Sequence, residues 1–218
     1  MIDVIGTDAG APASLTQAQQ ILIRAAQHVA APRRLQPALR QWLGSSCPLL
    51  INSDDPRTLA TNLERIPEQE TVVVLASGDP LWFGIGRSLL ERLGVGRLRF
   101  HPAPTSLQLA FARIGRPWQD ADWVSLHGRD PEVLAAALQK RPSALAVLTD
   151  PQQGGADTVQ RILRSSGLEA CTQLWLCENL GHADERVRCV DPGCPLPADT
   201  EPLLIALLIA KPPAPPLP

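Results

Sequence analysis

The sequence predicts an α/β protein built from two domains, and three features of the chain support this. Short apolar runs alternate with amphipathic segments along most of the 218 residues, which is typical of strands followed by helices. The run Thr71–Ala76 is β-branched and apolar without alternation, as expected for a parallel strand covered on both faces. Several runs end in turns rich in glycine, proline and small polar residues. A chain of this length can form two cores.

The first half contains three predicted strands before the central one. They are Ile2–Ile5, His28–Ala31 and Pro48–Ile51. Thr16 and Gln19 have the spacing of a capping box at a helix start, and Asp55 followed by Pro56 indicates a second helix that runs to about Arg65. This order predicts a parallel sheet covered by helices.

The turn Ser77–Pro80 follows the central strand and precedes a helix that Gly94 ends. Gly78 can adopt a positive φ and lets a ligand approach the backbone, while Pro80 ends the strand ladder. Open α/β sheets bind ligands at such turns, beyond the carboxyl ends of parallel strands. The sequence therefore predicts a ligand-binding turn here, and an ordinary turn between a strand and a helix is the alternative.

The second half repeats this pattern. The remaining predicted strands are Leu98–His101, Trp123–His127, Ala144–Leu148, Leu174–Cys177 and the buried run Leu203–Ala210. Helices are predicted after the turn 102–106, after Asp130-Pro131 and over 156–166, and the proline-containing stretch 189–202 is predicted as a long loop. We expect an N-terminal domain over 1–103, a C-terminal domain over 104–210, and an extended proline-rich tail or linker over 211–218.

Composition argues against several kinds of partner. The net charge is -2 and no basic run occurs, so neither a nucleic acid nor a membrane surface is expected. The longest apolar stretch is far shorter than the roughly 20 residues of a spanning helix, and residues 1–20 lack the pattern of a signal peptide, so we expect a cytoplasmic protein. The five cysteines and four histidines have no ligand spacing, so no metal is expected.

Four motifs together carry a resemblance to a known family. They are Ser77–Pro80 with Phe83 and Gly84, then Pro-Ala-Pro-Thr-Ser-Leu-Gln-Leu-Ala-Phe-Ala-Arg at 102–113, Ser-Leu-His-Gly-Arg at 125–129, and Glu-Asn-Leu-Gly with Asp-Glu-Arg at 178–186. With them the chain resembles the tetrapyrrole methylase family, and within it the branch that methylates C5 of a precorrin-6-type ring in cobalamin (vitamin B12) biosynthesis. The match spans roughly residues 2–210.

The resemblance implies the tetrapyrrole methylase fold, two α/β domains with S-adenosylmethionine (SAM) in the interdomain cleft. Carried over by position, the implied cofactor-binding residues are Ser77, Gly78, Asp79, Trp82, Thr105, Ser106, Thr149, Leu180 and Gly181. The first loop of the family has more glycines than Gly6–Gly10 here, which leaves the geometry of that loop open. For Thr105 and Ser106, a role as helix caps alone is the alternative.

The expected substrate carries many carboxylates, for which guanidinium groups are the natural partners. Arg113, Arg129 and Arg186 are the candidate substrate-binding residues, and solvated surface arginines are the alternative. Asp79, Glu178 and His127 are each possible bases, but none is chosen, so the catalytic residue stays unknown.

Family analogy further predicts a homodimer, and a second, C15-methylating and decarboxylating domain that is either fused beyond the tail or separate. There are two rival hypotheses. One is a methylase of the same fold that acts on another precorrin, on ribosomal RNA or on a modified histidine of a translation factor. The other is a non-catalytic subunit that binds SAM or tetrapyrrole.

Overall fold

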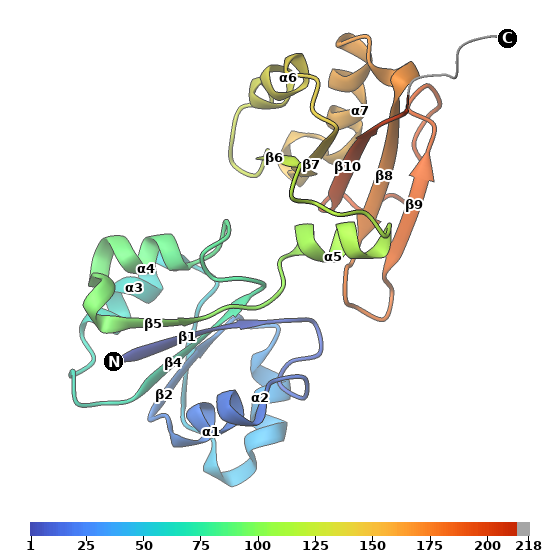
Figure 1. Cartoon of the computed structure of the whole chain (residues 1–218). Coiled ribbons are helices and arrows are strands. Elements are labelled where there is room, and N and C mark those ends of the chain that lie inside the picture. The colour runs from blue at the N-terminus through green and yellow to red at the C-terminus, as the bar shows by residue number, and fades with distance from the viewer. Residues whose placement is uncertain (213–218) are drawn as a thin grey trace, which may run out of the picture. The chain divides into compact units, whose positions relative to one another are not determined.

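The computed structural model of the chain describes residues 1–212 and divides into two compact units (Figure 1). The first unit is Met1–Thr105, and the second begins at Ser106. Most of the predicted tail lies outside the described residues. Among the described residues, no helix is long and apolar enough to cross a membrane.

The first unit contains a five-stranded sheet in the order β3-β2-β4-β1-β5, with every strand parallel to its neighbours. The strands are β1 (Ile2–Thr7), β2 (His28–Ala31), β3 (Leu49–Asn52), β4 (Val72–Ser77) and β5 (Leu98–His101). The helices are α1 (Gln17–Ala25), α2 (Gln36–Leu43), α3 (Pro56–Glu64) and α4 (Gly86–Leu93), with short 3-10 turns at Gly44–Ser46 and Val95–Arg97.

Helices cover both faces of this sheet, α1 and α2 on one side and α3 and α4 on the other (Figure 1). Alternate side chains of β4 enter the two cores: Val73 and Leu75 pack in one, Val72 and Val74 in the other. The prediction of a central parallel strand buried on both faces is confirmed. Because the neighbouring strands run parallel, their carboxyl ends meet at one edge of the sheet.

Local signals place the helix starts. Thr16 and Gln19 form the predicted capping box at α1. The Asp55 carboxylate accepts hydrogen bonds from the N–H groups of Arg57 and Thr58 and so caps α3, which Pro56 begins. Helix α2, which has no side-chain cap hydrogen bond at its start, was not predicted.

The second unit contains a five-stranded sheet in the order β6-β7-β10-β8-β9. The strands are β6 (Asp122–Ser125), β7 (Ala144–Leu148), β8 (Thr172–Glu178), β9 (Arg186–Val190) and β10 (Ile205–Ala210). The helices are α5 (Ser106–Arg113), α6 (Glu132–Gln139) and α7 (Gly155–Ser165), with 3-10 turns at Pro151–Gln153 and Glu169–Cys171. Leucine and valine side chains of α6, α7 and the strands form one core.

This second sheet is mixed, which corrects the expectation that the second half repeats the first. Only β6 and β7 pair in parallel, whereas β10 pairs antiparallel with both β7 and β8. No helix lies between β8 and β9, which form an antiparallel pair. The predicted strand Trp123–His127 ends earlier, at Ser125, so His127 lies in the following turn.

Candidate functional site

The predicted ligand-binding turn lies directly after β4. Gly78 has a φ of 63°, and its N–H donates to the Thr7 carbonyl at the end of β1, at 2.8 Å. The Asp79 carboxylate accepts a hydrogen bond from the Leu81 N–H at 2.7 Å. The turn is therefore fixed by one hydrogen bond to β1 and one within itself, and the positive φ explains the glycine.

Backbone packing brings the end of β1 against the loops that follow β4 and β5. A Cβ atom at Gly6 would lie 2.5 Å from the Gly78 carbonyl oxygen and 2.8 Å from the Ala103 Cβ, so no side chain fits at Gly6. A Cβ atom at Gly78 would meet no protein atom nearer than the Pro104 oxygen, at 3.8 Å. A Cβ atom at Gly78 would therefore make only ordinary van der Waals contacts, so its φ of 63° is the reason for a glycine here.

Large apolar side chains flank the same turn. Leu81 is 55% exposed and Phe83 is 44% exposed. The half-buried Trp82 ring meets the Phe83 ring edge to face, with centroids 4.8 Å apart. Exposed apolar groups beside a polar turn offer both kinds of contact that a largely flat, partly polar ligand needs.

Ser77, the last residue of β4, contacts an arginine that was not among the predicted site residues. Nη2 of Arg34 donates to the Ser77 Oγ at 2.5 Å. Arg34 is exposed, and among the described residues no carboxylate pairs with it. Its position after β2, at the same sheet edge as the turn, is the only signal that sequence could have provided.

Thr105 is buried, and Ser106 is the first residue of α5. Both follow the loop that contacts Gly6 and Gly78. The side chain of Thr149 instead binds the backbone of its own unit. Its side chain is completely buried, and its Oγ1 contacts the Pro202 and Leu204 carbonyls while accepting the Leu204 N–H at 2.9 Å. These bonds join the end of β7 to the start of β10.

Leu180 and Gly181 lie in the loop between β8 and β9. Gly181 has a φ of 82°, and its N–H donates to Oε2 of Glu185 at 2.6 Å. Glu185 also accepts hydrogen bonds from both Nε and Nη2 of Arg113, the latter at 3.0 Å. These bonds, first of all those from Arg113, lower the pKa of Glu185, and Glu185 raises the pKa of Arg113.

Arg186, a second candidate for substrate binding, belongs to an ion network. The fully buried carboxylate of Glu178 accepts from Arg186 at 3.1 Å and from Arg188 at 2.8 Å. Asp199 contacts both arginines, and its hydrogen bond from Arg188 lowers its pKa. The network satisfies Arg186 within the chain, as it does Glu178, one of the three possible bases.

The third arginine candidate, Arg129, lies exposed in the turn after β6, where its carbonyl accepts from Nε2 of Gln153 at 2.6 Å. His127, in the same turn, is 64% exposed, and its Nδ1 lies 3.9 Å from the Asp150 carboxylate. The Gly128 and Gln152 N–H groups lower the pKa of Asp150 by hydrogen bonding. Asp150 therefore joins two loops at the carboxyl ends of β6 and β7.

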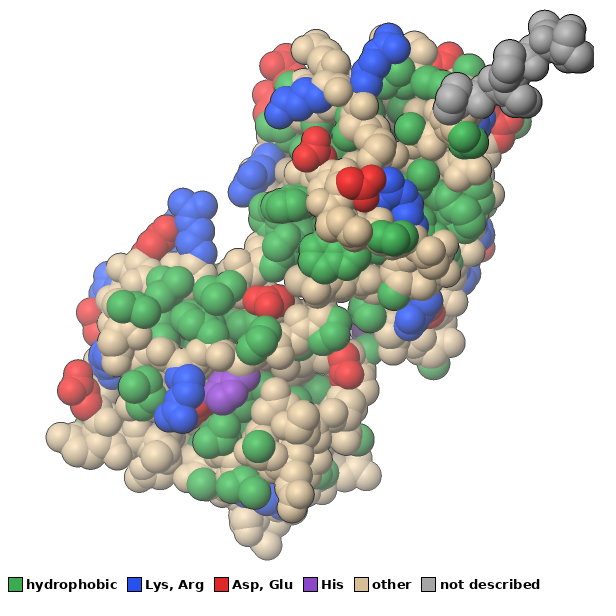
Figure 2. Space-filling view, viewed as in Figure 1, with side chains coloured by type: hydrophobic (Ala, Val, Ile, Leu, Met, Phe, Trp, Pro, Cys, Tyr) green, Lys and Arg blue, Asp and Glu red, His purple; other side chains and the backbone are tan. Residues whose placement is uncertain are grey.

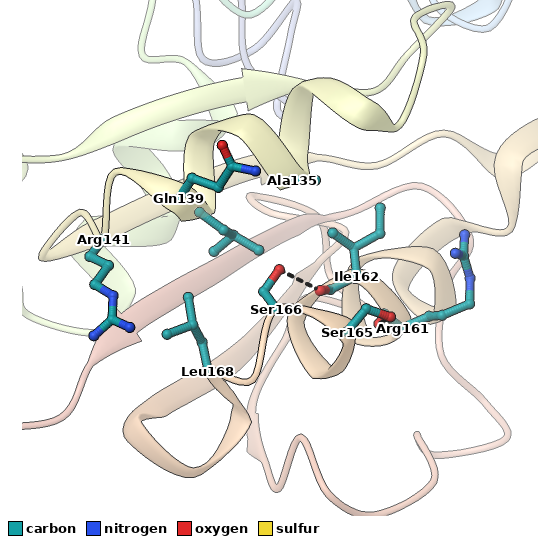
Figure 3. A pocket seen from close by; sticks show the side chains of 9 residues that line it. Ala135, Gln139, Arg141, Arg161, Ile162, Ser165, Ser166 and Leu168 are labelled. Carbon is teal, nitrogen blue, oxygen red and sulfur yellow. Dashed lines mark hydrogen bonds between the residues drawn. The ribbon is translucent and has the colours of Figure 1, made fainter.

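A separate pocket of about 490 Å³ lies elsewhere, between the carboxyl-terminal parts of α6 and α7 (Figure 3). Its lining includes Arg141, Arg161 and Leu168. These residues precede β7 and β8 in the chain, whereas the predicted residues follow the strands, so this pocket belongs to the opposite edge of the sheet. None of the predicted site residues lines it.

Comparison with protein families gives a match over residues 1–191 to the family model described as Tetrapyrrole (Corrin/Porphyrin) Methylases. The chain belongs to the tetrapyrrole methylase family. The predicted membership is thus confirmed, and the turn after β4 lies inside the matched region.

Two kinds of curated relative align with about half of the residues of this tetrapyrrole methylase. It is 40% identical over 116 residues, 53% of its length, to the precorrin-6Y C(5,15)-methyltransferase [decarboxylating] of Sinorhizobium sp. It is 31% identical over 117 residues to the cobalt-precorrin-7 C(5)-methyltransferase of Salmonella typhimurium. The aligned part spans only 27% and 55% of the lengths of these two relatives.

Solved structures confirm the fold of the family. A precorrin-6Y methylase of cobalamin biosynthesis from Archaeoglobus fulgidus superposes with a TM-score of 0.64 at 23% identity, covering 97% of this chain and 98% of that chain. A uroporphyrin-III C-methyltransferase from Thermus thermophilus, complexed with S-adenosylhomocysteine, has a TM-score of 0.65 at 21% identity and covers 95% and 96%.

Proposed function

We propose that this chain is a SAM-dependent C-methyltransferase that methylates C5 of a precorrin-6-type ring in cobalamin biosynthesis. The observation that carries the proposal is the turn after β4, where an uncrowded glycine of positive φ lies beside polar groups and exposed apolar side chains. The names of the relatives indicate which ring carbon is methylated. One kind of relative is named for C5 and C15, and the other for C5 alone. C5 is the position that both names share.

The residues around this turn fit SAM as the methyl donor. Gly78 lets the ligand approach the backbone, and Leu81, Trp82 and Phe83 offer apolar surface for an adenine ring. Ser77, Asp79 and Thr105 supply polar groups in the first unit, and Ser106 is the next residue in the chain after Thr105. Leu180 and Gly181 contribute from the second unit, while the buried Thr149 supports its loop. When bound, SAM supplies an electrophilic methyl group.

In this reaction the residues of the chain position the substrate and the methyl donor. Transfer of a methyl group from a sulfonium requires the nucleophilic carbon to be held in line, about 3 to 3.5 Å away, with little water present. The conjugated ring activates its own carbon, so no residue needs to form a covalent bond. Arg113, Arg129 and Arg186 remain the proposed partners of the ring's carboxylates, and Arg34 joins them because no carboxylate among the described residues pairs with it.

The decisive experiment is turnover with purified substrates. The chain should transfer one methyl group from SAM to precorrin-6Y or to cobalt-precorrin-7, seen as one added methyl by mass spectrometry, without release of carbon dioxide. Tight binding of SAM and ring without a methylated product would favour the non-catalytic alternative. Methylation of a different precorrin, with neither of these rings accepted, would favour the alternative substrate.

We further propose a cytoplasmic homodimer, by analogy with the family. In this proposal the C15 methylation and decarboxylation belong to another domain or protein, because the aligned part covers only 27% of the C(5,15) relative. A monomeric mass by light scattering at tens of micromolar would contradict the dimer.

A further inference from the structure

The loop between β8 and β9 holds a carboxylate against three donors. Glu185 accepts from Nε and Nη2 of Arg113 and from the Gly181 N–H. A guanidinium that binds both oxygens of a carboxylate, together with a backbone N–H presented by a positive-φ residue, is a general arrangement for recognising an anion. The donors come from α5 and from the loop, so they form a small receptor around the carboxylate.

Glu185 differs from the acid that holds the neighbouring arginines. Glu178 is completely buried and fixes Arg186 and Arg188 from inside the β8–β9 pair. By contrast, 21% of the Glu185 side chain and 41% of the Arg113 side chain are exposed. A carboxylate from solvent can therefore reach Arg113 and replace Glu185, whereas the acid that holds Arg186 and Arg188 is inaccessible to solvent.

We propose that Arg113 and the Gly181 N–H form a binding site for a carboxylate of the ligand, and that Glu185 of the chain occupies this site until the ligand displaces it. This inference rests on the proposed function only for the identity of the ligand, a ring with several carboxylates. It gives the Gly181 N–H a contact with the substrate, in addition to the cofactor contacts proposed for Leu180 and Gly181.

Exchange of one carboxylate for another preserves the hydrogen bonds and the charge at Arg113. Glu185 then acts as an intramolecular competitor, whose strength is that of a solvent-exposed ion pair. Such pairs favour the paired form, in which Glu185 is bound to Arg113, on the order of fivefold. Removing Glu185 should therefore tighten the binding of an external carboxylate by about fivefold, since Arg113 is then always unpaired and ready to bind.

The first test uses citrate, a tricarboxylate, and follows the Gly181 amide signal by ¹H–¹⁵N NMR of the full chain. In E185A, citrate should shift this signal and bind about fivefold more tightly than to the wild type. In R113A/E185A the shift should disappear, because the guanidinium is missing. An unmoved Gly181 signal in E185A, or equal citrate affinity in E185A and wild type, would overturn the proposal. If E185A does not fold, E185Q provides the same comparison.

The second test asks whether the tetrapyrrole uses this site. Cobyrinic acid, a corrin ring with free carboxylates, should bind E185A more tightly than wild type, and cobyric acid, in which all but one are amides, should gain much less. The matched control is E91A, which removes an exposed partner of Arg87 at 2.9 Å on α4 and should change neither affinity.

The two tests separate the failure of this inference from that of the proposed function. If citrate binds as expected but no variant binds either corrinoid, the carboxylate site stands and the proposed substrate is wrong. If cobyrinic acid binds wild type and E185A equally, the ring does not compete with Glu185 and the inference is wrong, whatever the methylation assay gives.

Discussion

Two glycines at the carboxyl edge of the first sheet exclude a side chain for different reasons. At Gly6 the obstacle is packing, since a Cβ atom would overlap the Gly78 carbonyl. At Gly78 the obstacle is the φ of 63°, since an added Cβ atom would make only ordinary contacts, the nearest at 3.8 Å. A substitution at Gly78 therefore tests the proposed approach of a ligand with little crowding inside the chain.

G78V should weaken SAM binding by at least about tenfold, because the branched side chain fills the space of the ligand and is strained at positive φ. The matched control is G94V, whose φ of 75° imposes similar strain with no atom within 4 Å of the added Cβ. Both variants should lose stability in urea, but calorimetry should show weaker binding only for G78V. Equal SAM affinity in folded G78V and wild type would contradict the assignment of this turn.

Asp150 makes stability depend on pH. Its pKa is lowered in the folded chain, chiefly by the Gly128 and Gln152 N–H groups, so its charged form stabilises the fold. This contribution is fully present above the unfolded-state pKa, about 3.9, and is lost as pH falls through the lower folded-state pKa. D150N should therefore flatten the fall of the urea midpoint below about pH 4. Parallel curves for D150N and wild type would show that these hydrogen bonds do not act in this way.

At the scale of elements, the β8–β9 pair is held by a buried carboxylate as well as by its ladder. Glu178 pairs with two arginines of β9, and it also accepts the Glu201 N–H at 2.8 Å, which ties in the chain leading to β10. The loop that carries Leu180 and Gly181 is thus anchored at its base. Its geometry should therefore depend on Glu178.

E178A should lower the free energy of unfolding by about 3 to 5 kcal/mol, because it leaves two partly buried arginines without their central partner. E91A, at an exposed pair, should change it by no more than about 0.5 kcal/mol. Urea unfolding measures both. A loss for E178A as small as that for E91A would mean that Asp199 alone satisfies the arginines.

Strands and helices with strong local signals were predictable, and those defined by tertiary contacts were not. The capping box at Thr16 and the apolar run of β4 identify their elements in sequence. β9 reads Arg-Val-Arg-Cys-Val, and its arginines make sense in a strand only once Glu178 lies beside them. Likewise, the motif located Arg113 and Gly181, but only the fold shows that Glu185 already binds both.

At the scale of the whole molecule, the charge distribution of the protein favours a carboxylated ring over RNA as the substrate. The net charge is -2, and many arginines already have acidic partners, among them Arg87, Arg92 and Arg116. Figure 2 shows cationic and anionic side chains scattered among apolar and neutral groups on the face in view. Such a distribution offers a few guanidinium groups for the carboxylates of a compact ring, but no continuous stripe for a phosphate backbone is visible on that face.

We therefore expect no binding of a labelled ribosomal RNA hairpin by fluorescence anisotropy at physiological salt, up to about 100 µM protein. Non-specific affinity for RNA comes from release of counterions by several cationic contacts, and it weakens steeply as salt is added. SAM-saturated protein is the form to test, since a methylase can depend on its cofactor for substrate binding. Micromolar binding that falls steeply with added salt would contradict the proposed substrate and revive the RNA methylase hypothesis.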